Sequence, residues 1–155
     1  MPSVTLRAMT SAEFDEWEPR AVQRYGEQQV QAGNIAAETA QEWAAGEYAK
    51  LLPQGLNSSG HHLLIAEQEG RRIGLLWLCV HTGDRPAFVY YVEVDPAMRG
   101  QGFGRTVMAA GEQYVGEHGA TSLGLHVFEH NLVARQLYDQ LGYRVSSTHM
   151  IKSLT

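Results

Sequence analysis

Six residues in the middle of the chain have the types and spacing of an anion-binding turn. The stretch Arg99-Gly100-Gln101-Gly102-Phe103-Gly104 follows an apolar run predicted to be a strand, 87–94, and precedes a predicted helix, 105–117. Three glycines let a ligand approach the main chain closely. The N–H groups at the start of a helix point outward and lie at the positive end of its dipole. The stretch therefore predicts a binding site for a phosphate-bearing ligand.

The order of residues in the turn distinguishes three kinds of phosphate-binding loop. A P-loop would end in Gly-Lys-Ser/Thr, and this turn does not. A dinucleotide-binding fingerprint would have a glycine where Arg105 stands. The third pattern, Arg/Gln-x-x-Gly-x-Gly/Ala, is matched by Arg99, Gly102 and Gly104. A glycine-rich turn that binds nothing is the remaining interpretation, and the joint occurrence of strand, turn and helix argues against it.

A second motif follows about thirty residues later, and the two motifs together resemble a known superfamily. Residues 131–143 match the pattern Asn-x-x-Ala-x-x-x-Tyr-x-x-x-Gly-Phe/Tyr. Over residues 86–145 the chain is similar to the GCN5-related N-acetyltransferases (GNAT), which carry acyl groups from coenzyme A to amines. The resemblance implies a single α/β domain, 1–155, with a mixed, mostly antiparallel sheet of about six to seven strands and about four helices. It also implies that the sheet is splayed between two parallel central strands, 88–94 and 122–128.

The resemblance implies acetyl-CoA as the co-substrate and assigns residues to it. The pyrophosphate is expected at the turn and the first helical amides, and the pantetheine arm along the strand before the turn and beside the second motif. The implied cofactor-binding residues are Val92, Val94, Arg99, Gly100, Gln101, Gly102, Phe103, Gly104, Arg105, Thr106, Asn131, Ala134 and Tyr138. Asn131 can equally be a helix cap.

Two side chains are predicted to move protons in the acyl transfer. Tyr138, whose phenol stays protonated at neutral pH, is the expected general acid toward the thiolate leaving group, and a tyrosine that only packs is the alternative. Glu93 is the expected general base, because it is the only carboxylate within 87–94. Simple alternation puts Glu93 on the face opposite Val92 and Val94 unless a bulge changes the strand. The other candidates for the base are Tyr90, Tyr91, His126, His130 or a relay of water molecules.

Composition and single residues exclude other functions. The net charge of −5 argues against a general affinity for nucleic acid or anionic lipid. The N-terminus has no signal-peptide pattern and no apolar run is long enough to cross a bilayer, so we expect a cytoplasmic protein without a membrane partner. Cys79, the only cysteine, lies in an apolar run and is predicted to be buried rather than nucleophilic. His126 and His130 flank Glu129 at a strand end, where side chains need not converge, so we expect no metal.

The remaining elements are predicted from capping, periodicity and turn signals. Thr10 and Glu13 form a capping box for a first helix, which Pro19 is expected to kink or divide. Val133, Leu137 and others at the same helical spacing are expected to pack on the sheet. The other predicted elements are strands at 4–7, 62–67, 72–80 and 122–128, helices at 36–52 and 132–141, and strand-forming sequence at 143–152.

We therefore expect an acetyl-CoA-dependent N-acetyltransferase that moves the acetyl group directly to a primary amine in a ternary complex. Two alternatives stay open: an acyl-CoA-binding sensor without catalysis, and a transferase of another acyl group such as succinyl or propionyl. The acceptor is expected to be an amine-bearing small molecule or a peptide. A homodimer is compatible with the sequence.

Overall fold

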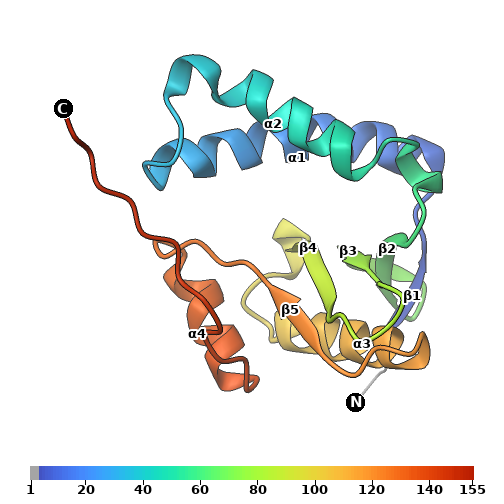
Figure 1. Cartoon of the computed structure of the whole chain (residues 1–155). Helices are drawn as coiled ribbons and strands as arrows, with labels where there is room; N and C mark the ends of the chain where they lie inside the picture. The colour runs from blue at the N-terminus through green and yellow to red at the C-terminus, as the bar shows by residue number, and fades with distance from the viewer. Residues whose placement is uncertain (1–3) are drawn as a thin grey trace. The chain divides into compact units, whose positions relative to one another are not determined.

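Five strands and four helices make up this computed structural model, which describes residues 4–155 (Figure 1). The elements are β1 (Thr5–Ala8), α1 (Ser11–Gln31), α2 (Ala37–Leu51), β2 (His61–Gln68), β3 (Arg71–Cys79), β4 (Ala87–Val94), α3 (Phe103–Glu117), β5 (Leu123–Leu125) and α4 (Leu132–Gln140). Two short 3₁₀ turns, η1 (Gly55–Asn57) and η2 (Pro96–Met98), precede β2 and α3. This order confirms the predicted α/β class.

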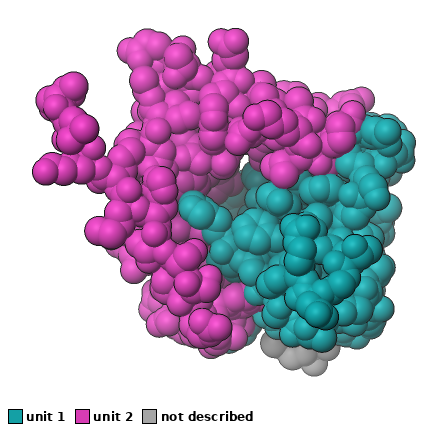
Figure 2. All heavy atoms as spheres, viewed as in Figure 1, with its two compact units in different colours: residues 1–14, 54–126 teal, residues 15–53, 127–155 magenta. Residues whose placement is uncertain are grey.

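The chain divides into two compact units that are each discontinuous in sequence (Figure 2). Unit 1 comprises Met1–Phe14 and Gln54–His126, and therefore contains the whole sheet and α3. Unit 2 comprises Asp15–Pro53 and Val127–Thr155, and therefore contains α2, α4 and all but the first turn of α1. The prediction that 1–155 forms a single domain stays a prediction.

One mixed sheet has the strand order β1-β2-β3-β4-β5. The first four strands pair antiparallel with their neighbours, and β4 and β5 pair in parallel. The predicted turn Glu69-Gly70 joins β2 to β3, and its two residues have φ values of 53° and 77°. Positive φ at both positions is what a two-residue hairpin turn requires, since it matches the twist of the flanking strands.

The prediction of six to seven strands was wrong, because the described residues form five. The segment after α4, residues 143–155, includes the predicted strand-forming stretch 143–152 and adopts neither helix nor strand. Its large apolar side chains are exposed, with Val145 at 81% and Leu154 at 89%. Strand propensity reflects packing against cross-strand neighbours more than a preference of the backbone itself. Without such burial, these residues have no reason to form a strand on their own.

Helix α3 packs on one face of the sheet at β3. A Cβ added at Gly111 of α3 would lie 3.2 Å from Cδ1 of Leu76, which shows how closely the helix approaches. Leu76 and Leu78 are fully buried, as are Val107 and Met108 of α3. Since side chains alternate along a strand, Trp77 and its alternate neighbours point to the opposite face.

Helix α1 continues through Pro19, so of the two expected outcomes the division into short helices was wrong, and the kink stays a prediction. The predicted capping box secures its start: Thr10 N–H donates to Glu13 Oε1 at 2.8 Å, and Glu13 N–H donates to Thr10 Oγ1 at 3.2 Å. Trp17 is 1% exposed and Ala21 is fully buried. A proline inside a helix costs about 3 kcal/mol, and burial of a large aromatic residue offsets a cost of that size.

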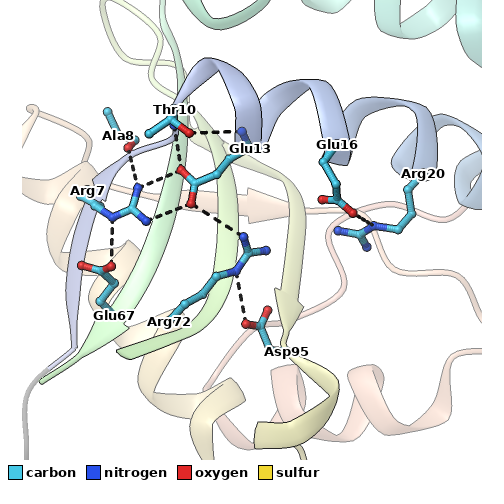
Figure 3. A network of polar contacts seen from close by, with 9 residues as sticks. All are labelled: Arg7, Ala8, Thr10, Glu13, Glu16, Arg20, Glu67, Arg72 and Asp95. Carbon is cyan, nitrogen blue, oxygen red and sulfur yellow. Dashed lines mark hydrogen bonds and ion pairs between the residues drawn. The ribbon is translucent and has the colours of Figure 1, made fainter. Parts of the chain in front are cut away.

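A network of alternating charges joins separate elements of unit 1 (Figure 3). Arg7 of β1 donates to both carboxylate oxygens of Glu13 at 2.9 Å and, through Nε, to Glu67 at 3.0 Å. Arg72 of β3 lies 3.9 Å from Glu13 and 3.2 Å from Asp95, the residue after β4. The hydrogen bonds from Arg7 lower the pKa of Glu13 to about 2, whereas the pKa of Arg7 is raised. Glu13, in the first turn of α1, is therefore linked through Arg7 to β2 and through Arg72 to the end of β4.

Candidate active site

Strand β4 contains a bulge at Tyr90. Trp77 of β3 is opposite Tyr91, and the next residue, Leu78, is opposite Val89, so Tyr90 is an extra residue in β4. A bulge turns a side chain away from the regular alternation and is frequent beside active sites. It confirms the irregularity expected in this strand.

The bulge does not bring Glu93 to the face of Val92 and Val94. Beyond the bulge the pairing is regular, with Val92 opposite Leu76 and Glu93 opposite Leu75. Residues directly opposite in an antiparallel pair share a face. Glu93 therefore lies on the face of Leu75, away from α3, as simple alternation predicts. A proton that Glu93 accepts as a general base would therefore come from that face.

The two parallel strands diverge after Val89. The ladder between β4 and β5 ends at Val89↔Leu125, whereas the ladder between β4 and β3 continues to Val94. Strand β5 is shorter than the predicted 122–128. The expected splay between the two parallel strands is confirmed, although β5 is the last strand of the described sheet and not a central one. The main chain from Tyr90 to Val94 thus lies beyond the ladder with β5, where an extended ligand can add as a further strand.

The glycine turn leads from this strand into α3. Gly100 and Gly102 have φ values of 76° and 81°, a conformation that other residues rarely adopt. Gly102 is the N-cap of α3, and a Cβ added at either glycine would meet nothing within 4 Å. The glycines are therefore required by the backbone path, and the space beside them is open. These features fit a phosphate ligand, because the helix N-terminus adds outward N–H groups there.

Main-chain hydrogen bonds are found immediately before and after the same turn. Arg99 N–H donates to Pro96 O at 3.4 Å, and the next such bond runs from Thr106 N–H to Gly102 O at 3.4 Å. Helix α3 begins at Phe103, two residues earlier than predicted, so the amides of Phe103 and the following residues belong to its first turn. The Nε of Arg99 donates to Val94 O at 3.0 Å, which ties the turn back to the end of β4.

The second motif lies in unit 2, on and around α4. Asn131 Oδ1 accepts a hydrogen bond from Ala134 N–H at 3.2 Å, so Asn131 caps the helix. Tyr138 is the buried residue of α4, with 9% of its surface exposed. Val133 is 82% exposed, so the expectation that it packs on the sheet was wrong, whereas Leu137 and Leu141 of the same stripe are half-buried. Periodicity identifies stripes on a helix but cannot say which of them is buried.

The phenol of Tyr138 combines a buried ring with an accessible hydroxyl. The ring lies edge-on to Tyr143, with centroids 5.9 Å apart. Burial raises the pKa of Tyr138 above its ordinary value. Among residues 4–155 the hydroxyl makes no hydrogen bond, yet it is not one of the buried polar atoms that lack a partner, so it reaches solvent. A protonated phenol that reaches solvent can donate to an external group.

A cluster that the sequence analysis missed surrounds Cys79 on the face away from α3. The indole N–H of Trp77 donates to His61 Nδ1 at 2.9 Å, and His61 Nε2 lies 3.8 Å from Cys79 Sγ. Because an indole only donates, Nδ1 must accept, and the proton of neutral His61 sits on Nε2 facing the sulfur. Burial lowers the pKa of His61 and raises the pKa of Cys79. Cys79 is 4% exposed, which confirms that it is buried.

Residues 4–155 contain no group of three or more His, Cys, Asp or Glu side chains arranged to hold a metal ion. None of the helices in this range combines the length and apolar character needed to cross a membrane.

Comparison with known proteins defines the class to which this fold and turn belong. Residues 13–143 match the model of the acetyltransferase (GNAT) family, and the chain belongs to this family. It is an acyltransferase of the N-acetyltransferase class. The family resemblance noted in the two sequence motifs is thereby confirmed.

Two relatives from Bacillus subtilis are similar over nearly the whole chain. The uncharacterized N-acetyltransferase YdgE is 33% identical over 97% of this chain and 98% of its own. The crystal structure of the acetyltransferase YycN is 32% identical, covers 99% of both chains and superposes with a TM-score of 0.93. The aminoglycoside N-acetyltransferase AAC(6′)-Iy in complex with CoA, 14% identical over 99% of this chain and 95% of its own, shares the fold with a TM-score of 0.59.

Proposed function

We propose that the protein transfers an acetyl group directly from acetyl-CoA to a primary amine in a ternary complex. One observation carries the proposal: the edge of β4 that diverges from β5 leads into a turn with two left-handed glycines and then into the start of α3. This sequence of features offers an extended edge for amides and, directly after it, helix N–H groups for an anion. When bound, acetyl-CoA supplies the activated acyl group as a thioester.

The residues of unit 1 would hold the co-substrate. The main chain of Val92 and Val94 pairs with the amides of the pantetheine arm, as a neighbouring strand would. The amides from Gln101 to Thr106, including those of Phe103 and Gly104, face the pyrophosphate, where Arg99 and Arg105 add positive charge. Gly100 and Gly102 keep the main chain accessible.

Three residues of unit 2 have roles that the family resemblance assigns to them. Ala134 is half-buried and removes bulk where the arm would lie, and Asn131 fixes the start of its helix. Tyr138 donates a proton to the leaving thiolate, because its raised pKa keeps the phenol protonated at neutral pH. The proposal treats residues 1–155 as one functional domain.

Glu93 would accept the proton that the amine must lose. It lies on the face of β4 away from α3, three residues beyond the bulge at Tyr90. The acceptor amine is therefore expected to approach from this face.

A matched pair of variants tests the assignment of the turn. Asn and Asp both tolerate the left-handed conformation of Gly102 and differ in charge. We expect Gly102→Asp to weaken binding of coenzyme A at least tenfold relative to Gly102→Asn, measured by calorimetry, because its carboxylate meets the pyrophosphate. Equal affinities for the two variants would refute the turn as the pyrophosphate site.

A screen of thiol release tests the reaction. Wild-type protein with acetyl-CoA is assayed against amines, amino acids and peptides, and at least one class is expected to release free coenzyme A. Parallel assays with succinyl-CoA and propionyl-CoA show whether another acyl group is preferred. Tight cofactor binding without thiol release on the whole panel would support a sensor instead.

A further inference from the structure

The aromatic side chains around the bulge are not used by co-substrate binding. The ring of Tyr90 stacks on Trp77, with centroids 4.8 Å apart and planes inclined by 28°. It also lies 4.7 Å from Phe88 and 5.7 Å from His61, so three rings hold it. Trp77 is itself 1% exposed and hydrogen-bonded to His61. Tyr90 is therefore rigid before any ligand arrives, which reduces the entropy lost on binding.

The hydroxyl of Tyr90 is available to a ligand. Within the part of the chain that the structure describes it makes no hydrogen bond, and it is not a buried atom lacking a partner, so it reaches solvent. Burial of the ring raises the pKa of Tyr90, and the phenol stays a hydrogen-bond donor at neutral pH. A donor fixed in place and open to solvent suits an acceptor group on a ligand.

A positive charge lies near the same ring. Arg85, in the loop between β3 and β4, is exposed and forms no ion pair with a described residue. This loop joins Cys79, at the end of β3, to the start of β4, and Cys79 lies two residues from Trp77 and therefore on the same face of the sheet. The charge of Arg85 also opposes the rise in pKa that burial causes in Tyr90 and Cys79, in keeping with this position. A guanidinium and a phenol on one side of a site form a two-donor anchor for a carboxylate.

A negative charge lies further along the same face. Glu93 is opposite Leu75, two residues from Trp77 on β3, so its side chain shares the face on which Tyr90 stacks. Glu93 is three steps along the strand from Tyr90, which corresponds to about 10 Å at roughly 3.3 Å per residue. The face therefore has a cationic anchor at one end and a carboxylate at the other.

We propose that Tyr90 and Arg85 bind a carboxylate of the acceptor while its amine is directed toward Glu93. The acceptor class would be zwitterions whose amine and carboxylate are separated by about 10 Å, the span of roughly three extended residues: short peptides and long ω-amino acids. This inference rests on the proposed N-acetyltransferase function and names the acceptor for that site. Simple amines without an anionic end would be poorer acceptors.

The test compares each acceptor with its neutral counterpart. Values of kcat/KM are measured with acetyl-CoA for glycine, diglycine, triglycine and 8-aminooctanoate, and for the amide of each carboxylate. We expect the free carboxylate to be preferred at least tenfold for triglycine and 8-aminooctanoate and much less for glycine, which is too short to span the face.

Variants test whether Arg85 and Tyr90 cause the preference for the free carboxylate. Arg85→Gln should reduce the ratio of kcat/KM for the free carboxylate to kcat/KM for the amide toward one. Arg85→Lys should retain part of this preference. Tyr90→Phe keeps the ring stack and removes the donor, so it should raise KM for triglycine several-fold. The matched control is Arg71→Gln, an exposed arginine at the start of β3, which should leave the ratio unchanged.

The outcomes distinguish this inference from the proposed function. A wild-type ratio near one, or a ratio that Arg85→Gln leaves intact, would overturn the anchor even if transfer occurs. If no amine is acetylated, the proposed function fails. Calorimetry of triglycine with wild type and with Arg85→Gln then still shows whether Arg85 binds the carboxylate. Binding by wild type that the variant loses supports the subsite, and equal or absent binding in both contradicts it.

Discussion

Arg72 Nε lies 3.2 Å from Asp95 Oδ2, and this ion pair joins the start of β3 to the residue that follows β4. The N–H of Asp95 also donates to Ile73 O at 2.8 Å, so Asp95 is held by both its side chain and its main chain. Asp95 directly precedes η2 and the glycine turn. The pair therefore fixes the point from which the proposed pyrophosphate loop departs.

We expect Asp95→Asn and Arg72→Gln each to raise the Kd for coenzyme A by about three- to tenfold, or roughly 0.7–1.4 kcal/mol. Calorimetry measures the affinity, and thermal unfolding should change little because a partly exposed ion pair contributes about 1 kcal/mol or less. The control is Glu16→Gln, which breaks the exposed Glu16–Arg20 pair of 3.4 Å on α1 (Figure 3). An equal effect of this control on affinity would contradict the positioning role.

The free energy of unfolding should fall in acid because Glu13 becomes protonated. Its pKa is about 2 in the folded protein against an ordinary 4.5, because Arg7 donates to it. Between these values the unfolded chain binds the proton more readily, so the contribution is full above about pH 4.5 and is lost as pH falls toward about 2. We expect a loss on the order of 1–2 kcal/mol, because the 39% exposure of the Arg7 side chain screens the pair.

Denaturant unfolding across this pH range measures the effect, and Glu13→Gln should flatten the slope. Glutamine keeps the capping box, so this variant removes the charge alone. The exposed Glu42→Gln on α2 is the control, and it should retain the wild-type slope. The same slope in wild type and Glu13→Gln would show that the acid sensitivity arises elsewhere.

Gly74→Ala should destabilise the sheet where β3 meets the end of β4. A Cβ at Gly74 would overlap the main-chain oxygen of Glu93, so the strands must separate. Overpacking of this kind costs about 1–3 kcal/mol. Gly46→Ala is the control, because an added Cβ in α2 meets nothing within 4 Å, and alanine should stabilise the helix by about 0.5–1 kcal/mol. Melting temperatures that shift in the same direction for both would contradict the close approach.

Tyr138→Phe should lower kcat by about 10²-fold or more, the range of a lost general acid, with the Kd for coenzyme A unchanged within about twofold. Because burial raises the pKa of Tyr138, the wild-type rate should fall with rising pH only as pH passes through a value above 10. The control is Tyr143→Phe, which alters the neighbouring ring. Equal losses of kcat and affinity in Tyr138→Phe would make Tyr138 a binding residue.

Local signals in the sequence predicted local structure well. The bounds of β4, the turn Glu69-Gly70 and the capping box at Thr10 agree with the structure, because each depends on residues within a few positions of one another. The splay between β4 and β5 followed from the family resemblance. Short-range chemistry and a recognised fold pattern thus account for most of the architecture.

Long-range pairing could not be predicted in the same way. The stack of Tyr90 on Trp77 depends on which residue of β3 lies opposite the bulge, and no pattern within either strand reveals that register. The segment containing Val145 was predicted to form a strand from its propensity alone, although strands need a neighbour. The spacing of residues in α4 revealed its stripes, but it did not show that Tyr138 would be buried and Val133 exposed.

The environment of Cys79 has a practical consequence for enzymology. The sulfur is 4% exposed, faces the Nε2 proton of His61 and has its pKa raised by burial, so it is a poor nucleophile at neutral pH. As the chain has one cysteine, chromogenic disulfide reagents will report coenzyme A released in turnover with little background from the enzyme. A second cysteine placed on the surface would likewise accept a fluorophore at a single position.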